Sequence, residues 1–279
     1  MLAEAEDVTL GDLGGILAAI RDAPVPAWDH RRHYEGPRMA EYVLVLSTLN
    51  FSFWGSGRGY WQLAEALRDA FDAGQPLWDS AFLSTIDEGE LRRHTGELPI
   101  MEKRASALRE LGRLALDDYG GELRRLVGDS AVELARLLSS RLDSYADFAT
   151  YKGFPVPLLK RAQIAAADLW GSGAADYSDI AVLTCFPDYK LPQVLRHTGA
   201  LVYSDRLARR IDDWQELEPG EPAEVEIRAA TVVAAEQITD ALARGGRELM
   251  EIEVDWILWA HSQSLYPVRP YHRTRTVFY

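Results

Sequence analysis

Apolar residues recur at helical spacing along most of the chain. Leu10, Leu13, Leu17 and Ile20 lie three or four positions apart, with Thr9 as a candidate N-cap. Comparable stripes occur over 131–142, with Asp129 or Ser130 as the cap, and over 159–170, which ends at Gly171. Further helices are expected over 60–73, 190–198, 204–214, 224–244 and 247–261. This pattern predicts a mostly helical protein of the all-α class.

Strand patterns are scarce. The segment 39–54 fits either a helix or a strand, and TRTVFY (274–279) alternates with period two, which predicts a strand. Glycine- and proline-containing stretches at 55–59, 171–179 and 217–223 are expected to be loops inside one unit, because they are short and mixed in composition. The expectation is a single domain over 1–279, with two helical lobes as a variant of that arrangement.

Charge and composition restrict the partners. The chain has 30 Lys and Arg against 43 Asp and Glu, a net charge of −13. Nucleic-acid binding draws much of its affinity from Lys and Arg that neutralise phosphates, so this balance argues against a nucleic-acid partner and favours a small-molecule substrate. No apolar run reaches the roughly 20 residues of a membrane span, and no secretory signal is visible. A cytoplasmic protein without a membrane partner is expected, and oligomeric state stays open.

Metal and common nucleotide motifs are missing from the sequence. A single cysteine, Cys185, and six histidines without ligand spacing predict that no metal is bound. The GSGRG stretch (55–59) lacks the Lys-Ser/Thr of a P-loop, and the chain has no G-x-S-x-G, H-E-x-x-H or dinucleotide-binding fingerprint. The remaining candidates for chemistry are therefore carboxylates and cations.

Asp255 occupies an unusual position. If 247–261 is helical, Ile252, Asp255, Trp256 and Trp259 lie at i, i+3, i+4 and i+7, which places a carboxylate on an apolar, indole-rich stripe. Burial of an ionised carboxylate without a partner is costly, so Asp255 should be paired, protonated or functional. The alternative is an aspartate at the edge of the stripe that caps a loop or pairs with an arginine, beside tryptophans of the core.

Two further positions carry candidate binding groups. Asp188 follows Phe186 in a turn, where a carboxylate could accept hydrogen bonds from a heterocycle while Phe186 stacks on its face. The alternative is a helix-capping aspartate.

Lys160 lies in the first turn of its helix, where a cation is disfavoured unless an anionic ligand compensates its charge. The alternative is a solvated lysine. The C-terminal arginines, Arg273 among them, could bind a phosphate or tie the tail to acidic helices.

Several blocks resemble the queuosine salvage protein family, among them TLNFSFW (48–54), LKRAQIAAADLW (159–170), FPDYKLPQVL (186–195), DWILW (255–259) and HRTRTVFY (272–279). The resemblance implies a mostly α-helical single domain similar to helix-hairpin-helix DNA glycosylases. It also implies hydrolysis of queuosine 5'-phosphate to queuine and ribose 5-phosphate, with no metal or organic cofactor. A non-catalytic queuine-binding protein and a DNA glycosylase-like enzyme are the alternatives.

The resemblance also assigns roles to residues. A carboxylate near C1' stabilises the positive charge of the transition state and can deprotonate water, and Asp255 is the candidate; Asp188 or Asp205 could take its place. The predicted substrate-binding residues are Phe186, Asp188, His33, Trp256, Trp259, Lys160, Tyr151 and Arg273. Among these, Phe186 and Asp188 suit the guanine-like base. Lys160, Tyr151 and Arg273 are candidates for the 5'-phosphate.

Overall fold

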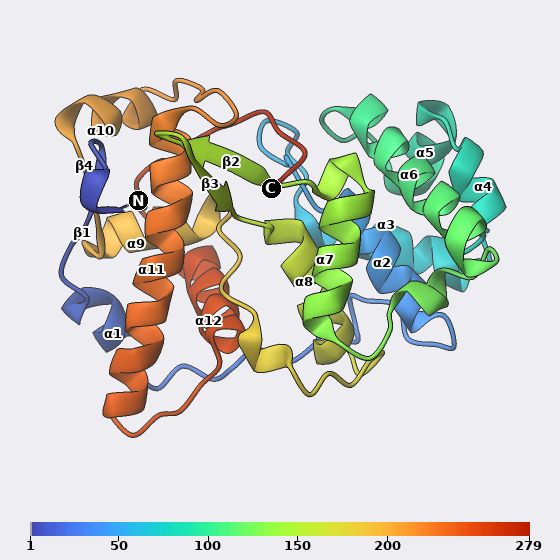
Figure 1. Ribbon diagram of the computed structural model, residues 1–279, viewed down its shortest axis with the longest axis horizontal. Coiled ribbons are helices and arrows are strands. Elements are labelled where there is room, and N and C mark those ends of the chain that lie inside the picture. The colour runs from blue at the N-terminus through green and yellow to red at the C-terminus, as the bar shows by residue number, and fades with distance from the viewer. Residues whose placement is uncertain (1) are drawn as a thin grey trace. The chain divides into compact units, whose positions relative to one another are not determined.

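The computed structural model describes residues 2–279, and most of them lie in helices (Figure 1). The chain divides into two compact units. Unit 1 comprises Met1–Pro26, Phe148–Lys160 and Leu183–Thr276, and unit 2 comprises Ala27–Asp147, Arg161–Val182 and Val277–Tyr279. Among the described residues, no helix is both long enough and apolar enough to cross a bilayer.

Unit 1 is built around its long helix α11. Its helices are η1 (Leu2–Glu4), α1 (Gly14–Ile20), α9 (Lys190–Thr198), α10 (Asp205–Asp212), α11 (Pro222–Arg244) and α12 (Glu251–Ser264). Its strands are β1 (Val8–Leu10), β2 (Phe148–Tyr151), β3 (Phe154–Pro157) and β4 (Leu201–Tyr203), which form two antiparallel pairs, β1 with β4 and β2 with β3. Helices α9, α11 and α12 pack together (Figure 1), and buried Val194, Ile227 and Ile257 fill the core between them.

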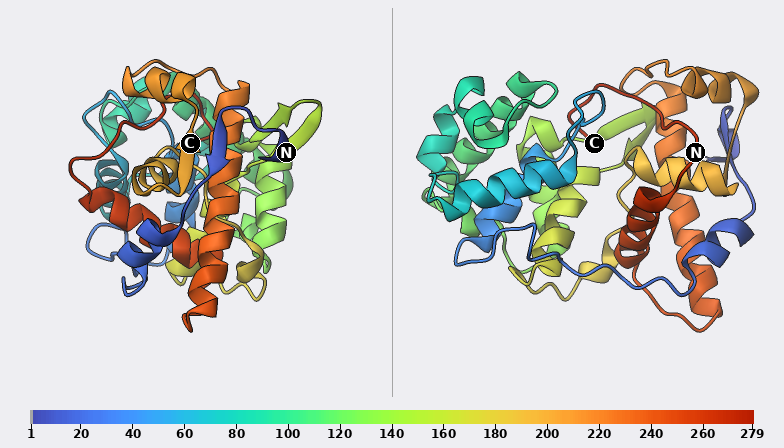
Figure 2. Two further views of the ribbon diagram at one scale, coloured as in Figure 1. Left: turned by 90° about the vertical axis from the view of Figure 1, so that its left-hand side faces the viewer. Right: turned by 180° about the vertical axis from the view of Figure 1, so that it is seen from behind.

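The described residues of unit 2 form helices and connecting loops, and no strand. Its helices are α2 (Met39–Leu49), α3 (Tyr60–Asp72), α4 (Ser80–Thr85), α5 (Glu88–Thr95), α6 (Met101–Tyr119), η2 (Leu123–Leu126), α7 (Ala131–Arg141), η3 (Asp143–Tyr145), α8 (Lys160–Gly171) and η4 (Ile180–Val182). Lys160, the first residue of α8, belongs to unit 1. Helices α4 and α6 lie side by side (Figure 2). Gly112 allows this approach, because a Cβ atom there would lie 2.5 Å from the Ser84 amide nitrogen.

Two buried arginines stabilise the end of α2 in unit 2. Arg161 donates to the carbonyls of Ser47 and Thr48, and Arg104 donates to the carbonyl of Leu49. Their guanidinium groups lie 4.6 and 4.4 Å from the centroid of the Phe51 ring. Cations at a helix C-terminus interact favourably with its free carbonyls, so these arginines fix the loop that follows α2.

Most of the helices expected from apolar periodicity are confirmed. The segments 60–73, 159–170 and 190–198 correspond to α3, α8 and α9 within one residue or so at each end. Ser130 is the N-cap of α7, since its hydroxyl accepts the Glu133 amide at 3.1 Å. The ambiguous segment 39–54 is resolved as α2 followed by a loop.

Two local predictions were wrong. The C-terminal segment 274–279 is not a strand, because within the described chain no other strand pairs with it; the neighbouring residue Arg273 forms only an isolated bridge with Glu216. Thr9 is not an N-cap, because Val8–Leu10 forms β1 and pairs with Leu201–Tyr203. That pairing joins segments about 190 residues apart, and the first helix begins only at Gly14.

Candidate active site

The segment 185–188 in unit 1 is held from two helices, and we call it the clamped segment. The Phe186 amide donates to Oδ1 of Asp255 on α12 at 2.7 Å. The Pro187 carbonyl accepts Nε of Arg228 on α11 at 3.0 Å. These contacts fix the peptide groups on either side of the Phe186–Pro187 peptide, so the Phe186 ring and Asp188 are carried on a backbone that is held at two points.

Asp255 is buried, with only 4% of its surface exposed. It lies on α12, where the nearby residues Val254 and Leu258 belong to the hydrophobic core. A buried carboxylate requires hydrogen-bond donors, and the Phe186 amide is one of them. The Asp255 carboxylate therefore contacts the backbone of the clamped segment, as expected if Asp255 caps a loop. The same contact places it next to Phe186, the residue predicted to stack on the base.

The single cysteine lies beside this carboxylate without being a nucleophile. Cys185 is fully buried, and its thiol donates to the Thr231 carbonyl on α11 with a sulfur–oxygen distance of 3.8 Å. Burial raises the pKa of the Cys185 thiol far above its usual range, and the carboxylates of Asp255 and Glu251 raise it further. The thiolate is the reactive form of cysteine, so Cys185 is a packing residue of the clamped segment.

Asp188 caps α9, as the alternative interpretation of its sequence position proposed. Its Oδ1 accepts the amides of Lys190 at 2.7 Å and Leu191 at 2.9 Å. Both bonds use the same oxygen, and no described group donates a hydrogen bond to Oδ2. Burial raises the pKa of the Asp188 carboxyl, and the positive charge of Lys160 is the largest effect opposing that rise. One oxygen thus holds the helix while the other keeps its acceptor capacity.

Lys160 is a buried cation and not a solvated one. It is the first residue of α8, follows Leu159 with its φ of 50°, and is only 5% exposed. Its charge acts on Asp188, which brings a cation and a carboxylate of the predicted site into one neighbourhood of unit 1. Lys190 adds a second, half-buried cation there: its ammonium lies 5.2 Å from the Tyr271 ring centroid.

Arg228 and Glu224 form a buried ion pair that the sequence analysis did not single out. They lie one turn apart on α11, with Nη1 of Arg228 3.4 Å from Oε1 of Glu224 and both side chains at most 3% exposed. Oε2 of Glu224 accepts the Gly220 amide at 3.1 Å. Burial and the Arg228 charge lower the pKa of His272 to about 3, so that imidazole stays neutral. The available signal was the i,i+4 order of Glu and Arg in EVEIR.

Tyr151 contacts another buried carboxylate, Glu226, which the sequence analysis also missed. The Tyr151 hydroxyl lies 2.6 Å from Oε1 of Glu226. The same carboxylate accepts the amides of Glu6, Asp7 and Val8 at 3.0, 2.7 and 3.0 Å. Burial and this hydrogen bond raise the pKa of Tyr151 to about 12. Glu226 therefore anchors both β1 and the β2–β3 hairpin to α11.

The remaining predicted residues of unit 1 are two tryptophans of α12 and one C-terminal arginine. Trp256 and Trp259 are half-buried on α12, and Trp259 packs against the core. The Arg273 guanidinium lies 3.9 Å from the ring centroid of Trp214, a cation–π contact. The C-terminal arginine is thus held on an aromatic surface at the end of unit 1.

His33 belongs to unit 2, where it is enclosed by aromatic side chains. Its ring stacks on Trp28 with a centroid distance of 3.8 Å. Nδ1 lies 3.0 Å from the Tyr42 hydroxyl and Nε2 lies 3.4 Å from the Tyr60 hydroxyl. Burial lowers the pKa of His33 to about 4, so the neutral ring can offer hydrogen bonds but no charge near neutral pH.

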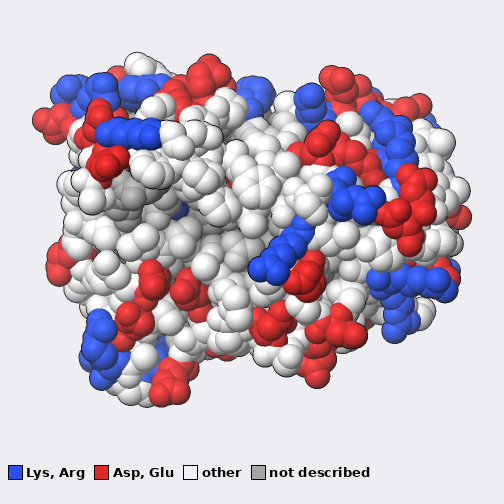
Figure 3. Space-filling model, in the orientation of Figure 1, with Lys and Arg blue, Asp and Glu red and all other residues white. Residues whose placement is uncertain are grey.

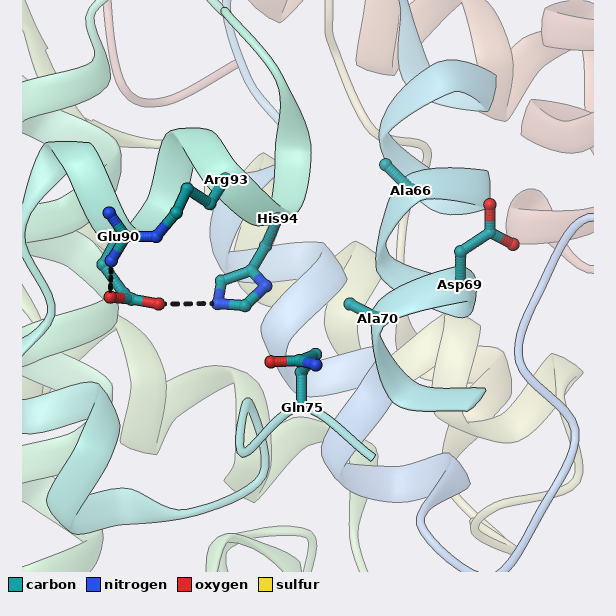
Figure 4. A pocket seen from close by; sticks show the side chains of 7 residues that line it. All are labelled: Ala66, Asp69, Ala70, Gln75, Glu90, Arg93 and His94. Atoms are coloured by element: carbon teal, nitrogen blue, oxygen red, sulfur yellow. Dashed lines mark hydrogen bonds and ion pairs between the residues drawn. The ribbon is translucent and has the colours of Figure 1, made fainter. Parts of the chain in front are cut away.

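Two other features lie apart from these groups. Asp205, the third candidate for C1', is exposed in the first turn of α10, which Ser204 caps. A cavity of about 480 Å³ in unit 2 lies between α3 and α5 (Figure 4), and it is lined by Ala66, Asp69, Ala70, Gln75, Glu90, Arg93 and His94. None of the predicted site residues lines that cavity. Within residues 2–279, no group of three or more His, Cys, Asp or Glu could hold a metal ion.

The fold and this geometry define a mostly helical protein whose unit 1 carries a buried carboxylate beside an aromatic and acidic segment. Residues 30–279 match the family model described as queuosine salvage protein, and the chain belongs to this family. It is 40% identical to a Sphaerobacter thermophilus protein named queuosine 5'-phosphate N-glycosylase/hydrolase, over 94% of this chain and 88% of that one. Proteins of the same name from Dictyostelium discoideum and Mus musculus are 34% and 33% identical, over 86% and 88% of this chain and 78% and 85% of theirs.

Proposed function

We propose that this protein hydrolyses the N-glycosidic bond of queuosine 5'-phosphate and releases queuine and ribose 5-phosphate for queuine salvage into tRNA. The observation that carries the proposal is the 40% identity to a protein of that named activity over most of both chains. The buried Asp255 beside the clamped segment supports it, because N-glycoside hydrolysis needs a carboxylate in a protected site.

The chemistry assigns Asp255 to the sugar. As the bond from C1' to the base nitrogen breaks, its electron pair leaves with the base and positive charge develops on the ribose ring. The Asp255 carboxylate stabilises that charge, more strongly in a site of low dielectric than in water. Water then adds its oxygen to C1', and its proton passes by way of the carboxylate to the departing base. The Phe186 amide holds Oδ1 of Asp255 in a fixed orientation during these steps.

The base is assigned to the clamped segment. The Phe186 ring can stack on the flat deazaguanine, and Oδ2 of Asp188 can accept the N–H groups of its guanine-like edge. This requires an ionised Asp188, which the charge of Lys160 and the two amides at Oδ1 favour against the effect of burial. Trp256 and Trp259 supply the apolar wall.

The 5'-phosphate is assigned to cations of unit 1. Lys160 is the strongest candidate, since its ammonium is a buried cation of the kind that binds phosphate. The roles of Tyr151 and Arg273 also stay predictions. To bind phosphate, the Tyr151 hydroxyl would have to contact both the phosphate and Glu226, and Arg273 would have to contact it from its position on the Trp214 ring. His33, which lies in unit 2, stays a prediction of the sequence as a substrate-binding residue.

Several finer expectations also stay predictions of the sequence. They are the similarity to helix-hairpin-helix DNA glycosylases, one functional domain over 1–279, the cytoplasmic location, and a small-molecule substrate without a nucleic-acid partner. On the face shown in Figure 3, acidic and basic side chains lie in small neighbouring groups and form no continuous basic patch.

The test is release of free queuine from queuosine 5'-phosphate by the purified protein, followed by chromatography. We expect release of one ribose 5-phosphate for each queuine. Tight binding of the nucleotide with no release would show a carrier. Binding to duplex DNA that weakens steeply with salt, without queuine release, would show a DNA-directed protein.

A further inference from the structure

We infer that Arg228 is a positioning residue for recognition of the base, acting through the main chain of Pro187. This inference rests on the proposed function, because it assigns a role within the same site. Its basis is the 3.0 Å hydrogen bond from Nε of Arg228 to the Pro187 carbonyl, between two groups that are buried.

The Pro187 carbonyl is the point at which the base-binding groups are joined. It lies in the backbone between Phe186 and Asp188, so its orientation sets how the aromatic ring and the carboxylate stand relative to each other. The Asp188 carboxylate is held at its other side by α9. Three helices therefore contact three consecutive residues: α12 contacts Phe186, α11 contacts Pro187 through Arg228, and α9 contacts Asp188.

Arg228 is itself fixed, as a positioning residue must be. Glu224 lies one turn away on α11 at 3.4 Å, and that carboxylate is anchored by the Gly220 amide. A buried charge costs free energy that an apolar side chain on α11 would avoid, so the ion pair is poorly explained by packing alone. The planar guanidinium directs Nε–H along a defined line, which a flexible lysine ammonium cannot reproduce.

The arrangement separates two parts of the site. Asp255 is carried by α12 and contacts the clamped segment through the Phe186 amide, whereas Arg228 holds Pro187 from α11. Loss of the Arg228 contact should disturb the Phe186 ring and Asp188, which recognise the base, while Asp255 on α12 still holds the Phe186 amide. The groups assigned to ribose and phosphate should then stay in place. The inference thus predicts a defect specific to queuine.

The experiment measures inhibition by each product separately. Arg228→Lys keeps the charge beside Glu224 but loses the fixed Nε–H, and the double variant Glu224→Gln/Arg228→Met removes both charges so that none is left buried alone. Arg196→Lys is the matched control, since Arg196 is a buried arginine of unit 1 that pairs with Asp212 at 2.8 Å. We expect the Ki of queuine to rise about 10- to 100-fold in both Arg228 variants, as for loss of a charged hydrogen bond.

The Ki of ribose 5-phosphate should stay within about threefold of wild type in the Arg228 variants, and both constants should stay near wild type in Arg196→Lys. An unchanged queuine Ki in folded Arg228 variants would overturn the inference. So would a parallel rise for both products, or a failure of both Arg228 variants to fold, because each outcome would make Arg228 a residue of general stability. If the wild type binds queuine but shows no turnover, the dissociation constants of queuine can be compared among the same variants. A failure of the proposed function is then distinguished from a failure of the inference about Arg228.

Discussion

The carboxylate of Asp255 accepts the main-chain amide of Phe186 at 2.7 Å, across 69 positions of the sequence. The residue assigned to the sugar and the residue assigned to the base are therefore joined by one buried hydrogen bond. A base stacked on the Phe186 ring would therefore bind at the residue whose main-chain amide orients Asp255.

Asp255→Asn should abolish turnover while the nucleotide still binds. Asparagine keeps an oxygen that can accept the Phe186 amide, but it lacks the charge and the basicity needed at C1'. We expect kcat to fall about 10³-fold and the dissociation constant to change less than about tenfold, measured by queuine release and calorimetry. Asp205→Asn, at the exposed first turn of α10, is the control and should retain turnover. The assignment fails if Asp205→Asn is the inactive variant.

Asp188→Asn should weaken recognition of the base without removing the helix cap. Asparagine caps a helix about as well as aspartate, and its oxygen can replace Oδ1. Its NH2 group would face the N–H donors of the base in place of Oδ2, so we expect the queuine Kd to rise about 10- to 100-fold. Asp79→Asn at the cap of α4 is the matched control, since Asp79 accepts the amides of Ala81 and Phe82. Equal queuine affinity in both variants would exclude Asp188 from base recognition.

His33 should make the protein less stable in mild acid. Its pKa is about 4 in the folded protein against 6.5 as an ordinary value, so between these values the unfolded chain binds a proton that the folded protein excludes. Stability is therefore lost as the pH falls from about 6.5 to 4, by up to about 1.4 kcal/mol per pH unit for this group.

His33→Gln should reduce the pH dependence of stability, because the variant lacks the one proton that the wild type takes up at His33 on unfolding. The measurement is the free energy of unfolding in urea at several pH values for the wild type and the variant. His197→Gln, at an exposed position of α9, is the control for replacement of a histidine by glutamine. An unchanged slope in His33→Gln would mean that His33 titrates alike in the folded and unfolded chain.

Glu226→Gln should loosen the N-terminal strand. The carboxylate accepts three amides and lies 2.6 Å from the Tyr151 hydroxyl, and glutamine offers one oxygen in place of two. We expect a loss of about 1–3 kcal/mol in the free energy of unfolding and faster proteolysis of the first ten residues. Glu6→Gln removes only an exposed ion pair with Lys152 and should leave the free energy of unfolding close to that of the wild type. Similar losses in the two variants would contradict the anchoring role of Glu226.

The helices were predictable from the sequence because their signals are local. The apolar stripes of α3, α7, α8 and α9 repeat within a few residues, and a cap such as Ser130 lies directly before its helix. The position of Asp255 on an apolar helix face could be predicted for the same reason. The family resemblance rested on whole blocks of sequence, and the match over 30–279 confirms it.

The tertiary structure alone decided which of these groups meet. The pairing of β1 with β4 overrode the helical pattern that begins near Thr9, and the lack of a partner strand within the described residues left 274–279 irregular. The hydrogen bonds of Asp255 to Phe186 and of Arg228 to Pro187 likewise join distant segments. The burial of Lys160 was also decided only by the tertiary structure. Such contacts depend on how distant segments pack in the folded chain. The spacing of apolar residues along the sequence indicates only which face of an element is buried, not which other element covers that face.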